Sequence, residues 1–160
     1  MKHFFDEEKG IEIIRYFVNN GLHDLYQIGK AMYFADLYHL SHYGFFIASD
    51  KYIAMDCGPV PSGLYDLLKD IRSKKNAFGI ETQGNNLIKA EPADLSNFSQ
   101  SDLIALNYGI NEVKDLDFGK IKAKSHDDAY DKTDLNKEIK LTDIANMFDN
   151  SKDIVEYIKR

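Results

Sequence analysis

The side chains best suited to chemistry are an acid and two histidines that recur at every third position: Asp36, His39 and His42. Residues three apart share one broad face of a helix, so these groups could present two imidazoles and a carboxylate to a metal ion. The HExxH helices of zinc enzymes instead place their histidines four apart. A metal-dependent enzyme that uses Asp36, His39 and His126 is therefore an alternative, and we favour a hydrogen-bonded polar seam on a buried helix.

Cys57 and Ser62 are the candidate nucleophiles. Cys57 is the single cysteine, so the sequence predicts no internal disulfide and no cysteine-based zinc site. As a nucleophile it would need a histidine within hydrogen-bond reach. Ser62 lacks the G-x-S-x-G elbow, and no glycine-rich phosphate-binding motif occurs. We therefore predict a protein that is not an enzyme, with no catalytic residue, no metal and no cofactor.

The charge balance bears on the class of partner. The 160 residues carry 20 basic and 26 acidic side chains, a net charge of -6, and residues 81–160 alone carry 11 and 16. Binding nucleic acid by broad phosphate neutralisation needs a positive face, so nucleic acid is not the expected partner. The one dense basic run, within residues 69–75, is typical of a solvated helix end.

The length and hydropathy of the chain set its class. A chain of 160 residues can bury about 70% of the surface that its unfolded form exposes, so we expect a single domain over residues 1–160. No stretch has the apolar length of a signal peptide or a membrane span. We therefore expect a cytoplasmic protein without a membrane partner.

Hydrophobic periodicity predicts three helices in the first half. Residues 6–20 carry one apolar stripe, and residues 24–44 are apolar nearly all round, which is typical of a central helix. Gly44 is expected to end the second helix, and Ser62 to cap a third helix over residues 63–74.

Capping patterns predict further helices in the second half. Ser99 with Asp102 and Ser125 with Asp128 both fit S-x-x-D, and Thr142 is expected to cap a last helix. The second half is therefore expected to be helical.

Alternating apolar residues predict two short hairpins. Residues 45–56 read as two strands joined at Ser49 and Asp50, and residues 78–90 as a second pair with its turn at residues 84–86. The predicted fold class is α+β: a mostly helical single domain with a small antiparallel sheet of two short hairpins.

The segment over residues 58–61, Gly-Pro-Val-Pro, is a stiff corner before the third helix. Its prolines fix two φ angles, the valine between them is pushed to extended geometry, and the glycine allows a turn that a side chain would forbid. The corner either simply redirects the chain or offers a preformed contact surface, because tyrosines beside it supply contact area at low entropy cost. The candidate partner-binding residues are Tyr52, Gly58, Pro59, Val60 and Tyr65.

Together these segments resemble a known family. KAMYFADLYHLSHYG over residues 30–44, followed by DKYIAMDCGPVPSGLYD over residues 50–66, resembles the signature of the Panacea domain, the SocA-like antitoxin family of bacteria and their phages. A later S-H-x-x-A-[WY] motif matches residues 125–130, where Tyr130 replaces the usual tryptophan. The resemblance covers about residues 5–135. The motif residues expected to support the fold are Lys30, Tyr33, Asp36, Tyr43, Gly44, Asp50, Ser125, His126 and Tyr130.

The resemblance implies an antitoxin that is encoded beside a toxin and neutralises it by direct binding, without enzymatic activity. One kind of family member is an adaptor that delivers its toxin to a protease, so a cellular protease is a second implied partner. The acidic second half would suit a basic toxin that acts on nucleic acid. The alternative is a DNA-binding regulator of its own operon, against which the acidic half and the lack of an arginine-rich recognition helix argue.

Overall fold

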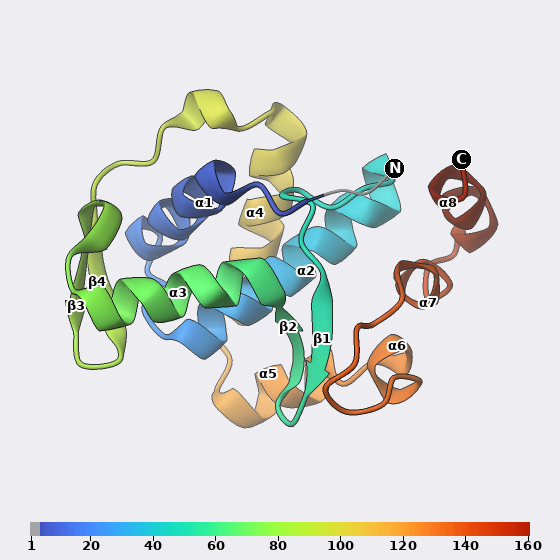
Figure 1. The fold of residues 1–160 in the computed structure, drawn as a ribbon. Helices are drawn as coiled ribbons and strands as arrows, with labels where there is room; N and C mark the ends of the chain where they lie inside the picture. Colours follow the sequence, from blue (N-terminus) through green and yellow to red (C-terminus); the bar gives the residue numbers. More distant parts are fainter. Residues whose placement is uncertain (1–3) are drawn as a thin grey trace.

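The computed structural model describes residues 4–160, and residues 1–3 of the predicted domain lie outside it. The mostly helical α+β fold is confirmed, with two separate antiparallel hairpins (Figure 1). Over the described residues, no helix has both the length and the apolar character needed to cross a bilayer. The elements are α1 (Glu7–Asn19), α2 (Leu25–Tyr43), β1 (Tyr52–Met55), β2 (Gly58–Pro61), α3 (Ser62–Lys74), β3 (Ile80–Gln83), β4 (Asn86–Ala90), α4 (Gln100–Val113), α5 (Phe118–Ser125), α6 (Asp128–Asp131), α7 (Leu141–Ala145) and α8 (Ser151–Ile158).

The predicted central helix is α2, which runs through the middle of the molecule (Figure 1). It packs against α3, α4, α5, α7, α8 and β2, which explains why its sequence is apolar nearly all round. The approach to α4 is close: a Cβ at Gly109 would lie 2.2 Å from the carbonyl oxygen of Ala31. Because α2 touches both halves of the chain, its side chains can tie them together.

The hairpin predicted over residues 78–90 is confirmed. Strands β3 and β4 pair antiparallel, with the turn at Gly84 and Asn85. The first hairpin lies elsewhere than predicted. Residues 45–50 contain one turn, at residues 47–48, and no strand, and β1 pairs with β2, so that the corner over residues 58–61 is itself a strand.

The physical reason for the first error lies in the backbone before β1. Ser49 has a φ of +54°, which interrupts an extended strand. The Ile47 N–H donates to the Asp36 carboxylate at 2.8 Å and not to a neighbouring strand. The outer side of β1 is taken by a distant segment, because the Ala54 N–H donates to Lys137 O at 3.0 Å and the Ile139 N–H to Tyr52 O at 2.8 Å.

The three caps predicted in the second half have different outcomes. Ser99 and Asp102 form the expected capping box at the start of α4. The pattern at Ser125 is wrong, because Ser125 is the buried last residue of α5 and Asp127 caps α6. Thr142 lies inside α7, which has no side-chain cap, and the chain ends in two short helices, α7 and α8.

Candidate functional site

The outer edge of β2 presents no backbone donor. The Ser62 N–H donates to Lys51 O at 2.8 Å, and this register turns the backbone groups of Val60 toward β1. Pro59 and Pro61 fall at the alternate positions, where an N–H would point away from β1 without a partner. The prolines therefore close this edge against a further strand, and any contact made here depends on side chains.

A buried lysine binds the outward carbonyl of β2. Lys30 of α2 is 2% exposed, and its Nζ donates to Pro59 O at 2.7 Å. Burial lowers the pKa of Lys30 to about 8, although charge interactions with Cys57 and Asp127 act in the opposite direction. The ammonium thus stays mostly protonated at pH 7 while it joins α2 to β2.

Asp36 joins α2 to β1 from inside the core. Its Oδ2 accepts from the Tyr52 hydroxyl at 2.7 Å and its Oδ1 from the Ile47 N–H at 2.8 Å. Burial raises the pKa of Asp36 to about 7, against the effect of these two hydrogen bonds. Tyr52 is 1% exposed, so it supports the hairpin from within and does not reach the surface where a partner would bind.

Asp50 caps α3 from the loop before β1. Its Oδ1 accepts from the Gly63 N–H at 2.8 Å and its Oδ2 from the Leu64 N–H at 2.9 Å. The cap predicted at Ser62 is wrong, because Ser62 is already the first helical residue and Pro61 before it has no side-chain acceptor. The capping oxygens come instead from a residue 13 to 14 positions earlier in the chain.

Asp50→Ala should lower the free energy of unfolding by about 2 kcal/mol, because two N–H groups at the start of α3 lose their acceptors. Urea denaturation measures the change, and Asp50→Asn should lose less because one acceptor oxygen remains. Asp66→Ala is the control, since the Asp66 side chain is 74% exposed on the same helix. Equal losses for Asp50→Ala and Asp66→Ala would show that water replaces the cap.

Asp127, which is not among the candidate residues predicted from the sequence, ties the second half of the chain to α2. The Tyr33 hydroxyl donates to Asp127 Oδ2 at 2.5 Å, and Asp127 Oδ1 accepts from the Tyr130 N–H at 3.0 Å. The Tyr130 hydroxyl in turn donates to Met55 O at 2.6 Å. Aspartate before a short helix is itself a capping signal, and that signal could have identified Asp127.

Gly58 brings β2 against the junction between α5 and α6. Its φ is +111°, and a Cβ there would lie 2.7 Å from Ser125 Oγ, 2.9 Å from Lys30 Nζ and 3.2 Å from His126 Cδ2. The His126 Nε2 is buried, with no hydrogen-bond partner among the residues that the structure describes. Four motif residues from three distant segments of the sequence therefore meet at one point.

The alternative metal site is not formed. His39 is 0% exposed, with Nδ1 2.7 Å from Phe45 O and Nε2 3.1 Å from Ser101 Oγ. Burial lowers the pKa of His39, which favours the neutral ring in this seam. Asp36 and His126 take part in other contacts, and between residues 4 and 160 no three His, Cys, Asp or Glu side chains are grouped to hold a metal ion. The polar-seam interpretation of α2 fits the geometry.

Tyr43 and Gly44 lie at the C-terminal end of α2. Gly44 has a left-handed φ of +89° and its N–H donates to Leu40 O at 2.9 Å, so the predicted helix end is confirmed. Tyr43 is 40% exposed, and its ring centroid lies 4.8 Å from that of His39. These two motif residues end the helix.

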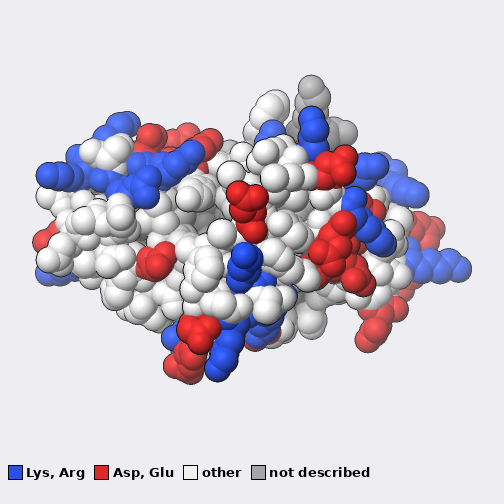
Figure 2. All heavy atoms as spheres, turned by 90° about the horizontal axis from the view of Figure 1, so that it is seen from below, with Lys and Arg blue, Asp and Glu red and all other residues white. Residues whose placement is uncertain are grey.

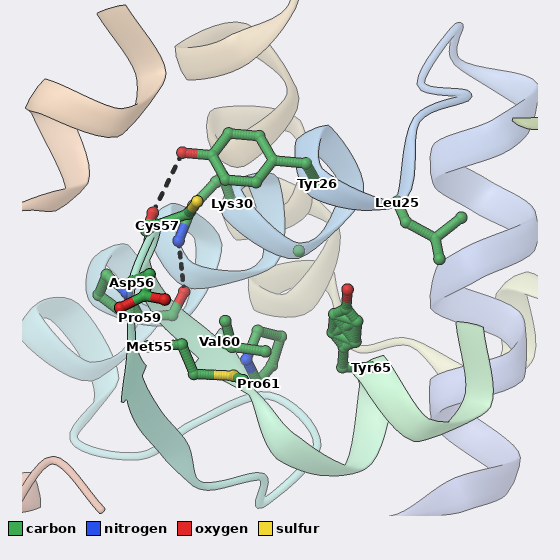
Figure 3. Close-up of a pocket in the computed structure, with 11 residues that line it drawn as sticks. Leu25, Tyr26, Lys30, Met55, Asp56, Cys57, Pro59, Val60, Pro61 and Tyr65 are labelled. Atoms are coloured by element: carbon green, nitrogen blue, oxygen red, sulfur yellow. Dashed lines mark hydrogen bonds between the residues drawn. The ribbon is translucent and has the colours of Figure 1, made fainter. Parts of the chain in front are cut away.

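A pocket of about 230 Å³, named here the β2 pocket, opens between α2, the β1–β2 hairpin and the start of α3 (Figure 3). In Figure 3, Lys30 and Tyr26 reach the hairpin backbone on one side and Tyr65 stands on the other. Of the candidate partner-binding residues, Val60 and Tyr65 are partly exposed, and Gly58 and Pro59 are buried. The apolar lining consists of Leu25, Met55, Pro59, Val60, Pro61 and Tyr65.

Figure 2 shows the molecule from below, with lysines and arginines gathered at the upper left, acidic and basic side chains mixed at the right, and large uncharged areas between them. The basic run of α3 is solvated as predicted: the Lys69 and Lys74 side chains are 53% and 65% exposed, and they pair with Asp66 and Asp70. Such exposed pairs contribute little to stability.

Comparisons with known proteins identify one family. The family model described as Antitoxin SocA-like, Panacea domain, matches residues 28–131, which run from α2 to α6. The match includes Lys30, both strands of the first hairpin and the motif at residues 125–130, so the resemblance drawn from these motifs is confirmed. Neither the curated proteins nor the solved structures gave a match. That residues 1–160 form one domain of this type stays a prediction.

Proposed function

This chain belongs to the SocA-like antitoxin family with the Panacea domain, and from this membership we propose that it neutralises one partner toxin by binding it directly. Membership supports an antitoxin-type role in general, suggests a role without catalysis, and implies a toxin as partner. We further propose that the toxin is encoded by an adjacent gene and that the complex forms in the cytoplasm.

The surface around β2 and the start of α3 is the proposed contact site. Val60 and Tyr65 are partly exposed there, above a strand fixed by two prolines and by the hydrogen bond from Lys30. A preformed surface loses little conformational entropy on binding, and aromatic side chains in such positions often dominate affinity. Tyr52, Gly58 and Pro59 support this surface from below.

The first experiment expresses the adjacent open reading frame with and without this protein. Growth arrest that the protein relieves, with both proteins recovered as a complex, supports the proposal. A harmless neighbour that does not co-purify contradicts it.

The half-life of the toxin in strains with and without the major cytosolic proteases separates the two modes of neutralisation. A half-life that the antitoxin shortens indicates a protease adaptor, and an unchanged half-life indicates steric inhibition.

Val60→Asp should weaken the complex at least tenfold, because it places a charge in the apolar contact surface. Isothermal titration calorimetry on the purified pair measures the affinity, and thermal unfolding confirms that the variant folds. Ile88→Asp is the matched control, because Ile88 is a 37% exposed apolar residue on β4 of the other hairpin. Unchanged affinity and growth rescue for a folded Val60→Asp variant would place the contact site elsewhere.

A further inference from the structure

Lys30 is a buried cation in the wall of the β2 pocket. Among residues 4–160, no carboxylate oxygen lies within 4.0 Å of its Nζ. In the same part of the chain, the one hydrogen-bond acceptor for this Nζ is Pro59 O at 2.7 Å. An ammonium group carries three donors, so two of them are not used by these contacts.

This arrangement costs free energy in the unbound protein. Buried charges are normally paired, because removing them from water is expensive. The lowered pKa of Lys30, about 8, reflects that cost. The ring of Tyr26, with its centroid 5.1 Å from Nζ, offers a weaker attraction than an acid would. A carboxylate brought to this point would gain a charge-assisted hydrogen bond to an ammonium that is already desolvated.

The rest of the pocket is apolar and small. Its volume of about 230 Å³ lies below the range of about 300–1,000 Å³ that is usual for small-molecule sites, and it suits one large side chain. Leu25, Met55 and Pro61 supply an apolar lining beside Tyr65. Asp56 also lines the pocket, but it is exposed, so water and salt screen its charge.

We propose that the β2 pocket receives an apolar side chain of the partner protein, and that a carboxylate on the same or the next partner residue binds Lys30. This inference rests on the proposed function, because the partner is the toxin. Charge complementarity selects this occupant: Asp127 attracts the ammonium only from beyond 4.0 Å, and an apolar side chain alone would fill the pocket without adding a closer carboxylate.

Two small probes test the chemistry of the pocket without the toxin. N-acetyl-L-phenylalanine and N-acetyl-L-phenylalaninamide have the same apolar body and differ in the negative charge. In NMR titrations of the full chain at pH 7, the acid should shift the amide signals of Cys57, Val60 and Tyr65 and bind at least five times more tightly than the amide. Equal affinities, or shifts confined to other residues, would overturn the proposal.

Two variants assign the preference to one lysine. Lys30→Gln removes the charge but keeps an N–H donor for Pro59 O, and it should abolish the preference for the acid. Lys69→Gln is the control, because the Lys69 Nζ lies 5.3 Å from the ring centroid of Tyr65 at the surface. If Lys30→Gln keeps the preference for the acid and Lys69→Gln loses it, the preference belongs to Lys69 and the proposal is refuted. If Lys30→Gln does not fold, the affinities of the acid and the amide for the unchanged protein still test whether the pocket prefers a carboxylate.

The partner itself gives the last test. Lys30→Gln should weaken the toxin complex at least tenfold, while Lys69→Gln leaves it within twofold. A complex of unchanged affinity with Lys30→Gln would overturn this inference and leave the proposed antitoxin function standing. No complex with the unchanged protein would contradict the proposed function, and the assignment of a partner to the pocket would fall with it.

Discussion

Asp36→Ala should lower the free energy of unfolding by about 3–5 kcal/mol at pH 5. The substitution removes the acceptor of two buried donors, the Tyr52 hydroxyl and the Ile47 N–H, which bond to Asp36 at 2.7 and 2.8 Å. Each buried donor left without a partner costs about 1–3 kcal/mol, and the lost volume adds a cavity. Urea denaturation at pH 5, where the carboxyl is mostly protonated, measures the loss without a contribution from the buried charge.

Asp36→Asn is the matched control for this loss. Its carbonyl oxygen can accept from the Ile47 N–H while its amide donates to the oxygen of Tyr52, so both contacts persist without a charge. We therefore expect Asp36→Asn to be within about 1 kcal/mol of the unchanged protein at pH 5. Equal losses of stability for the two variants at pH 5 would contradict the assignment of the loss to these two hydrogen bonds.

The same pair of proteins gives a pH dependence of known sign. Burial raises the pKa of Asp36 from 3.8 to about 7, so the folded state holds this proton more tightly than the unfolded state. Between pH 4 and 7 the folded state then binds more protons, and the stability that this group contributes falls as pH rises. Asp36→Asn lacks the group, so its stability relative to the unchanged protein should increase across this window. A difference that is flat with pH would contradict the burial of an ionising Asp36.

The helices were predictable because their signals are local. The all-round apolar sequence of α2, its end at Gly44 and the capping box at Ser99 and Asp102 each depend on residues within a few positions of one another. The second hairpin was predictable for the same reason, since its turn and both strands lie within residues 80–90. For these elements, residues close together in the sequence are enough to determine the local structure.

The first hairpin and the caps near it depend on distant partners. The acceptor of the Ile47 N–H is a side chain 11 residues earlier, and the cap of α3 comes from Asp50. The two prolines of β2 also argue against predicting a strand at residues 58–61, because proline is found in strands mainly at the edge of a sheet. Periodicity carries no information about which side chain will supply an acceptor.

At the candidate site too, local features could be predicted from the sequence and contacts between distant segments could not. The motif residues were identified from the sequence, but their contacts were not: that Lys30 would bind Pro59 O, and that Tyr33 would bind Asp127, follows from packing between segments about 30 and 90 positions apart. The burial of Tyr52 could not be predicted either. Alternating residues along a strand define two faces, but the alternation does not say which face packs against α2.

Gly58→Ala should destabilise the protein by about 3–4 kcal/mol. The position has a φ of +111°, which costs a residue with a Cβ about 1–3 kcal/mol. The new methyl group would also lie 2.7 Å from Ser125 Oγ and 2.9 Å from Lys30 Nζ, so both side chains must move in a packed interior. Forced repacking of this kind typically adds about 1–3 kcal/mol. Urea denaturation measures the total.

Gly21→Ala separates the two contributions. Gly21 has a φ of +92°, and nothing lies within 4 Å of the position of its Cβ, so this variant measures the backbone cost alone. The difference between the two variants then reports the close approach of β2 to the junction between α5 and α6. Ser125→Ala removes Ser125 Oγ, the atom nearest to the new methyl group. Gly58→Ala should therefore cost less stability in a Ser125→Ala protein than in the unchanged protein. If Gly58→Ala costs no more than Gly21→Ala, the convergence of the motif residues at Gly58 contributes nothing to stability, and the glycine serves the backbone turn alone.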